Sequence, residues 1–216
     1  MVARSFTVAF EGIEAPLVEV QCAVAAGIPS FAIVGLPNKA VSEARERVRA
    51  ALAAMSIALP AKRITINLSP ADMPKDGSHY DLAIAVAVLA EIGVVPKDAA
   101  EGAVVLGELA LSGALVGVAG ALPAAVAAAA CDRTLICPAD CGAEAAWVDA
   151  TAVYAPATLA QTIAHLKGER LLSPAEASIA PASASTTRCF TRMSITASSP
   201  AVGRCPARPC AGRPAP

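Results

Sequence analysis

Hydrophobic and polar positions alternate in several short stretches of this chain, which is the pattern of strands that bury one face. Other short apolar runs, bounded by glycine, proline or charged residues, have the length of buried strands. Together these patterns predict strands over residues 5–10, 17–24, 31–34, 63–68, 104–106, 115–118 and 134–136. In the fourth of these, Ile64, Ile66 and Leu68 should face the core, and the residues between them should not.

Between the strands, the hydrophobic spacing changes to that of helices. In residues 38–55 the apolar side chains recur on one helical face, and Asn38 stands where an N-cap belongs. Further helices are expected over residues 82–92, 122–130 and 158–167, the first of them apolar nearly all round. Gly168 should close the last one as a C-cap. Strands and helices in this order predict an α/β fold.

The polar face of the first predicted helix is strongly charged. It carries Glu43, Arg45, Glu46, Arg47 and Arg49. Such a run most simply predicts a solvated surface, and a docking surface for a neighbouring domain or subunit is the alternative.

The composition describes a core without many large side chains. Hydrophobic residues make up 56% of the chain but aromatic residues only 3%, so Ala, Val, Leu and Ile must fill the core by close packing.

Residues 109–131 contain no charge and are long enough to span a bilayer. They contain three glycines and Pro123, however, and are expected to form buried strands and a helix start. We therefore expect no membrane contact, and with no secretory signal visible, a cytoplasmic protein.

Charge divides the chain into two parts. All 18 acidic residues lie at or before Glu176, whereas five of the 17 basic residues lie after it. The acidic body disfavours a broad nucleic-acid surface, and a DNA-binding accessory module is accordingly the weakest hypothesis. The last stretch has no periodicity and is rich in Pro, Ser, Ala and Arg. We expect one domain over residues 1–170 and a disordered tail over residues 171–216.

Cofactor and metal motifs are not found in the sequence. Neither a Walker A loop nor a G-x-G-x-x-G loop occurs, so no nucleotide site is predicted. Seven cysteines are scattered without a C-x-x-C pair, and Cys131, Cys137 and Cys141 lack the spacing of a zinc site. The thiols are expected to be reduced and without a metal.

The loop "NLSPADMPKDGSHYDL", residues 67–82, is the best candidate for chemistry. Ser78, His79 and Asp81 provide a hydroxyl, an imidazole and a carboxylate, but close sequence neighbours do not easily adopt the geometry of a triad. A simpler interpretation is that Ser78 caps a helix beginning near His79, with Asp81 in its first turn. Lys75 and Asp76 are then exposed loop charges. No role is predicted for the other histidine, His165.

Several long motifs resemble a known family. In order, they read "FEGIEAPLVEVQ", "GIPSFAIVGLPNKAVSEARERVRAAL", "PAKRITINLSPADMPKDGSHYDLAIAVAVLAEIG" and "GELALSGALVGVAGALPAAVAA". They resemble the N-terminal domain of the magnesium-chelatase-like AAA+ ATPases of bacteria, the ComM/YifB family. This resemblance implies a Lon-protease-domain-like fold of two layers, of the ribosomal-S5-domain-2-like type.

The resemblance also implies where the family's activities lie. ATP and Mg belong to a following AAA+ module, and this chain by itself is expected to bind no cofactor. Family members are described as hexameric helicases that promote DNA branch migration during natural transformation. The resemblance implies self-association or contact with an AAA+ module, and DNA contact only through that module. Because the AAA+ motifs do not follow, we expect a truncated or frameshifted member.

Lon-type peptidases allow a comparison of single residues. "PKDGSHYD" aligns with their catalytic loop from Pro74, which places His79 at the nucleophilic serine and Ser78 one residue away. "GELALSGALVGVAGAL" aligns from Gly107 and places Leu122 at the position of the basic lysine. A serine without an adjacent base is a poor nucleophile. The resemblance therefore implies a non-catalytic scaffold or assembly domain. The alternative is a Lon-like peptidase that uses Ser78 with an unconventional base, His79 or Lys75.

Overall fold

The computed structural model of the protein describes residues 2–12 and 14–178. The tail predicted to be disordered lies outside these residues from position 179 onward. In the described part, nine strands and six helices follow one another as β1 (Ala3–Val8), β2 (Leu17–Ala25), β3 (Ser30–Val34), α1 (Lys39–Ala54), β4 (Arg63–Ser69), α2 (Asp81–Glu91), α3 (Lys97–Glu101), β5 (Ala103–Val105), β6 (Glu108–Leu109), β7 (Leu115–Val116), α4 (Ala121–Ala130), β8 (Thr134–Ile136), α5 (Ala139–Ala145), β9 (Val153–Tyr154) and α6 (Leu159–Leu166).

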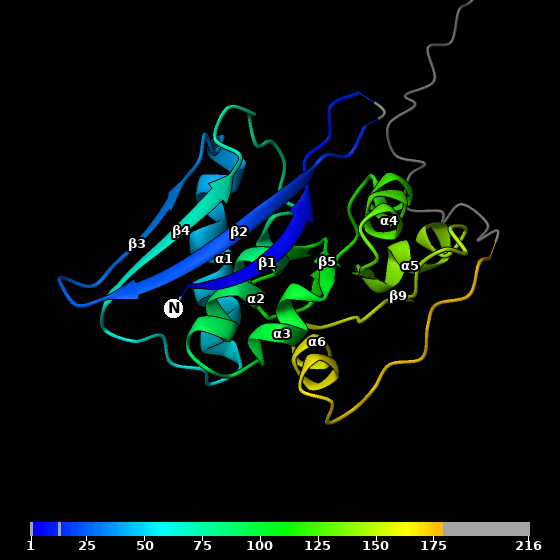
Figure 1. The fold of residues 1–216 in the computed structure, drawn as a ribbon. Coiled ribbons are helices and arrows are strands. Elements are labelled where there is room, and N and C mark those ends of the chain that lie inside the picture. Colours follow the sequence, from blue (N-terminus) through cyan, green and yellow to red (C-terminus); the bar gives the residue numbers. More distant parts are fainter. Residues whose placement is uncertain (1, 13, 179–216) are drawn as a thin grey trace, which may run out of the picture. The chain divides into compact units, whose positions relative to one another are not determined.

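Seven of the strands form one sheet in the order β3-β4-β2-β1-β5-β8-β9 (Figure 1). The β1–β2 and β2–β4 pairs are antiparallel, and the other four neighbouring pairs are parallel. Strands β6 and β7 make a separate short hairpin. A mixed, mostly parallel sheet with helices between its strands confirms the α/β prediction.

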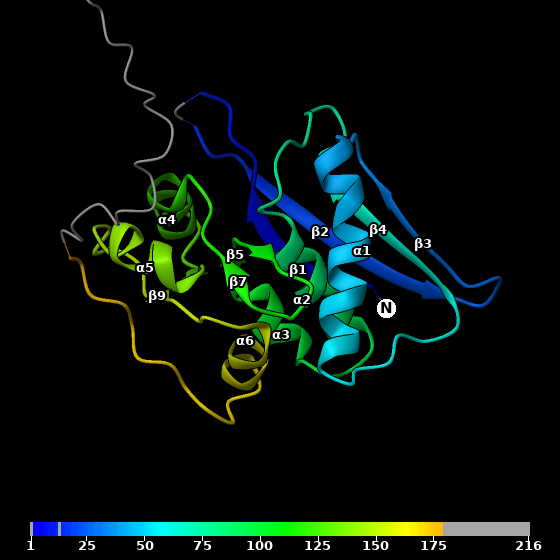
Figure 2. The same ribbon diagram turned by 180° about the vertical axis from the view of Figure 1, so that it is seen from behind.

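Helices cover the two halves of this sheet differently. Helices α1 and α2 pack on one face of the sheet, whereas α4 and α5 belong to a second apolar cluster (Figures 1 and 2). Along β5, Val105 contributes to the first cluster and Val104 to the second, since successive side chains point to opposite faces. The prediction of two layers was therefore wrong for the β5-β8-β9 half, where helices cover both faces.

The other half of the sheet does have only two layers. On the face turned away from α1 and α2, β2, β4 and the start of β1 carry polar side chains that bond along and across the strands, whereas Phe6 and Val8 of β1 belong to the second apolar cluster. Glu19 accepts a hydrogen bond from Gln21 at 3.1 Å and pairs with Arg4 at 3.2 Å. Asn67 Nδ2 extends this row by donating to Gln21 Oε1 at 3.2 Å. These side chains are exposed or half-buried, as expected for the open face of an antiparallel sheet.

Local signals in the sequence explain most of these elements. The Asn38 side chain accepts a hydrogen bond from the Val41 amide at 2.9 Å and caps α1, as predicted. Gly168 follows α6 with φ +73°, the left-handed conformation expected of a C-cap glycine. Helices α3 and α5 were not predicted, because five and seven residues are too few to show a helical period.

The core is built from small aliphatic side chains, and α2 is its centre. The first ten residues of α2, residues 81–90, are all buried. Among the aromatic residues Phe31 and Tyr80 are buried, whereas the only tryptophan, Trp147, is 57% exposed just after α5. Among the described residues no helix is both long and apolar enough to cross a bilayer.

Candidate functional site

The loop between β4 and α2 is held from within by Lys75. This side chain is completely buried, and its Nζ donates to the carbonyls of Pro70 and Met73. The Lys75 backbone also bonds to the segment that enters α1, donating to Leu36 O at 3.2 Å and accepting from Asn38 N at 3.0 Å. The prediction of an exposed loop charge was wrong for Lys75, because two backbone carbonyls of the same loop accept hydrogen bonds from the buried amine.

His79 is buried at the end of the same loop. Its Nε2 lies 2.9 Å from Val8 O, so this nitrogen carries a proton and donates to the carbonyl. The ring also packs against Phe10 and Tyr80, with centroids 4.9 and 4.2 Å away. Burial lowers the pKa of His79 below its ordinary value. The imidazole is therefore a neutral structural donor.

Neutral burial of His79 predicts a specific pH dependence of stability. A histidine with a lowered pKa in the folded state takes up a proton on unfolding once the pH falls below about 6.5. The free energy of unfolding should then decrease as the pH falls from 7 to 5. Replacing His79 by glutamine should reduce this decrease by up to about 1 kcal/mol per pH unit. Urea unfolding at pH 7, 6 and 5 measures the free energy of unfolding of both proteins. An equal decrease with falling pH in the unaltered chain and in His79→Gln would contradict the prediction.

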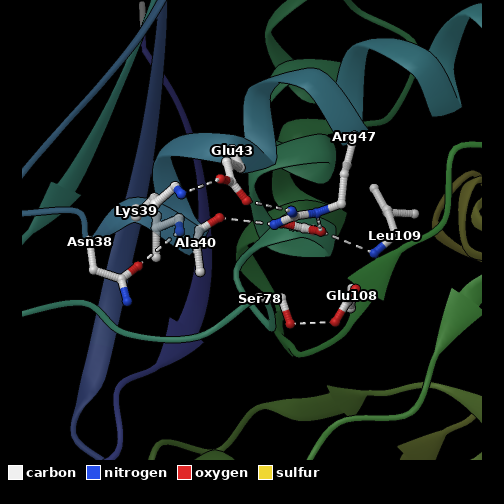
Figure 3. Close-up of polar contacts among 10 residues, drawn as sticks. Asn38, Lys39, Ala40, Glu43, Arg47, Ser78, Glu108 and Leu109 are labelled. Carbon is white, nitrogen blue, oxygen red and sulfur yellow. Dashed lines mark hydrogen bonds and ion pairs between the residues drawn. The ribbon is translucent and has the colours of Figure 1, made fainter.

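Ser78 faces a different partner from the one expected. Its hydroxyl donates a hydrogen bond to the Glu108 carboxylate, from the start of β6 (Figure 3). The predicted helix cap was wrong, since α2 begins at Asp81 and has no side-chain cap. Both Ser78 and Glu108 line an open pocket of about 340 Å³. His79 lines it too, and the other lining residues are Phe10, Asp76, Gly77, Gly117, Val118 and Ala119.

An ion pair between Arg47 and the buried Asp81 lies next to the segment that carries Glu108. The Asp81 carboxylate is 0% exposed and receives Arg47 Nε at 2.5 Å and Nη2 at 2.9 Å, as well as the Leu109 amide at 3.2 Å (Figure 3). Arg47 also donates to Ala40 O at 2.9 Å. Burial raises the pKa of the Asp81 carboxyl, and the hydrogen bonds from Arg47 and Leu109 oppose that effect. The prediction of a solvated face was therefore wrong for Arg47, which joins α1 to the start of α2.

Two backbone hydrogen bonds fix the segment that carries Glu108. Leu82 N donates to Gly107 O at 3.0 Å, and Gly107 N donates to His79 O at 3.0 Å. Together with the bond from Leu109 to Asp81, they align residues 107–109 with the first turn of α2. This alignment brings Glu108 within reach of Ser78.

The residues considered for catalysis are thus near one another without forming a dyad. No hydrogen bond links Lys75 or His79 to the Ser78 hydroxyl in the described part of the chain, since both bond backbone carbonyls instead. Burial lowers the pKa of the Lys75 amine, as a general base requires, but the amine bonds carbonyls of its own loop and not Ser78.

The other two residues considered lie away from Ser78. Leu122 lies on α4 and lines a separate groove. His165 packs on Tyr154 and accepts from the Leu172 amide at 3.1 Å.

Sequence reasoning missed Glu108 and Arg47. Glu108 had one usable signal, because a lone carboxylate follows a glycine between two apolar strands. Arg47 had none, since it stands among other charges on α1. Among the described residues, no group of three or more potential ligands is arranged to hold a metal ion.

Comparison with known proteins identifies the family of this chain. Residues 18–141 match the family described as subunit ChlI of Mg-chelatase. The chain is 41% identical over 161 residues to the competence protein ComM of Haemophilus influenzae, which covers 74% of this chain and 32% of that protein. Identity to YifB is 40% for Salmonella typhimurium and 39% for Escherichia coli, with the same coverage. The chain spans about a third of the length of these curated relatives. It belongs to the magnesium-chelatase-like family that includes ComM and YifB.

Proposed function

We propose that this chain is a non-catalytic scaffold or assembly domain of a magnesium-chelatase-like AAA+ ATPase. Its domain would have the Lon-protease-like fold that the family resemblance implies, with the catalytic loop kept as a structural element. The observation that supports this best is the hydrogen bonding of Ser78, whose hydroxyl bonds the Glu108 carboxylate and, among the described residues, no amine or imidazole. Lys75 and His79 instead hold the loop through backbone carbonyls.

The remaining family activities are proposed for the part of the relatives that this chain does not match. ATP and Mg²⁺ would bind there, and so would DNA in the branch migration that the resemblance implies. The Haemophilus influenzae relative is named a competence protein, which is in keeping with the role in natural transformation that the resemblance implies. The cytoplasm is the proposed location. We expect the full chain to hydrolyse no ATP.

One observation favours a second candidate, a Lon-like serine peptidase. Ser78 bonds a carboxylate in an open pocket, so an acceptor for its proton is present. A carboxylate is nevertheless a much weaker base than the imidazole or amine of known serine enzymes. In addition, the Asp81 carboxylate, the third member of the predicted triad, is paired with Arg47 and forms no hydrogen bond with Ser78 or Glu108 among the described residues.

A cleavage assay separates the two candidates. The full chain is incubated with casein at pH 5 and pH 8, together with Ser78→Ala and Glu108→Gln. The scaffold proposal expects no cleavage above the level of the Ser78→Ala protein at either pH, because the nucleophile lacks an effective base. Cleavage by the unaltered chain that is lost in both variants would overturn it and establish the peptidase.

A further inference from the structure

Two surfaces of this domain combine exposed apolar side chains with charges of opposite sign that form no ion pair among the described residues. The first, which we call the acidic end, comprises the tip of the β1–β2 hairpin and the adjoining face of α4. Glu11 and Glu14 are exposed at the tip, and neither forms an ion pair with another described residue. Between the hairpin and α4 lies a groove of about 700 Å³, where Leu122 and Val126 are 40% and 55% exposed.

The second surface, the basic end, is a pocket of about 540 Å³. It lies between the last turns of α1, the start of β3 and the loop over residues 56–62. Arg49 and Lys62 line it together with the apolar side chains of Phe31, Ile57 and Leu59, and no acidic residue lines it. Neither cation pairs with a carboxylate in the described ranges. The pocket is therefore suited to an acidic group beside apolar surface.

Strand β2 separates these two surfaces. Leu17, at one end of β2, pairs with Val8 next to the hairpin tip, whereas Ala25, at the other end, pairs with Arg63 beside the basic pocket. Nine residues of strand span about 27 Å. Figure 1 shows β2 running between the two ends. Glu11 and Glu14 are therefore too far from Arg49 and Lys62 to pair with them within the described part of one molecule, whereas a second copy can bring these opposite charges together.

We propose that the acidic end of one copy of this chain docks into the basic end of another, head to tail. The inference rests on the proposed function as an assembly domain and names the surfaces that would assemble. Glu11 and Glu14 would pair with Arg49 and Lys62, and the apolar groove at α4 would be covered beside them. A head-to-tail contact joins two different surfaces, so it produces rings or filaments rather than closed two-fold dimers.

Charge reversal tests this pairing on the full chain. The tip variant is Glu11→Lys/Glu14→Lys, and the pocket variant is Arg49→Glu/Lys62→Glu. Sedimentation velocity over a concentration series, at low and high salt, measures the association. Each variant alone should associate at least about tenfold more weakly than the unaltered chain, because like charges now face each other. High salt should weaken association of the unaltered chain.

A mixture of the two variants provides the decisive measurement. The lysine tip of one variant faces the glutamate pocket of the other, and the remaining two surfaces keep their native charges. An equimolar mixture should therefore regain association, and so should a single chain that carries all four reversals. Asp149→Lys and Arg170→Glu serve as matched controls, since both residues are exposed and lie outside the two surfaces.

The possible failures are distinguishable. If the unaltered chain stays monomeric at every concentration and salt, the proposed assembly role fails together with this inference. If the chain associates and the reversals have no more effect than the controls, the assembly role stands and the proposed surfaces are wrong. If each variant is weakened but their mixture is not restored, the two ends do not bind each other, and an acidic partner of another kind occupies the basic pocket.

Discussion

Replacing Arg47 by methionine is expected to lower the free energy of unfolding by about 3 to 5 kcal/mol. The change leaves the Asp81 carboxylate fully buried without the two hydrogen bonds it receives from the guanidinium. Only the Leu109 amide would still donate to it. Urea unfolding at pH 7, followed by far-ultraviolet circular dichroism, measures the loss.

Two further variants test whether the loss comes from the Asp81 carboxylate that is left buried without a partner. Arg45→Met removes an exposed arginine whose partner, Glu46, is also exposed, and it should cost less than about 0.5 kcal/mol. The double variant Arg47→Met/Asp81→Asn should be more stable than Arg47→Met, because no charge is left without a partner. The deficit of Arg47→Met should also shrink as the pH falls toward 5, since the unpaired carboxyl then takes up a proton in the folded state. A deficit that does not change with pH would contradict the explanation.

Replacing Gly35 by alanine is expected to destabilise the fold by a similar amount, about 3 to 5 kcal/mol. Gly35 follows β3 with φ +105°, a conformation that side chains rarely adopt. A Cβ atom at this position would lie 2.1 Å from the carbonyl oxygen of Leu68 in β4. Because the obstacle is backbone in a paired strand, the clash can be relieved only by separating β3 from β4.

Gly93→Ala is the matched control. Gly93 also has a positive φ, +79°, but apart from the adjoining residues no heavy atom lies within 4 Å of the place that an alanine methyl group would take. The alanine should therefore cost only the backbone strain, about 1 kcal/mol. Thermal unfolding of both variants measures the difference. Similar losses at the two glycines would show that strain alone, and not the contact with Leu68, sets the cost of substitution at Gly35.

The sequence predicted the regular elements well where a period or a cap was present. Strand β8 was predicted with its exact bounds, residues 134–136, because a β-branched threonine and two apolar residues stand between charged and proline-containing segments. Val41, Ala44 and Val48 are buried on α1 as their spacing indicated. The buried sides of β4 are also as predicted. Local chemistry was sufficient in these cases because the signal lies within one element.

The candidate site was harder to predict because its contacts join distant segments. Lys75 is buried by carbonyls of its own loop, which no charge pattern reveals. Arg47 and Asp81 are 34 residues apart, and Ser78 and Glu108 are 30 apart. Each of these pairs depends on how α1, α2 and β6 pack. A charged residue on a polar helix face looks the same in sequence whether it faces solvent or a buried carboxylate.

The position of Trp147 determines which optical signals report on folding. This indole is 57% exposed in the native state, so its fluorescence emission should already lie near that of the solvated side chain. Denaturant would then change the emission spectrum only slightly, even when the aliphatic core has unfolded completely. A tryptophan introduced for Phe31, which packs against the core beneath β3, would supply the quenching and wavelength shift that the natural chromophore lacks.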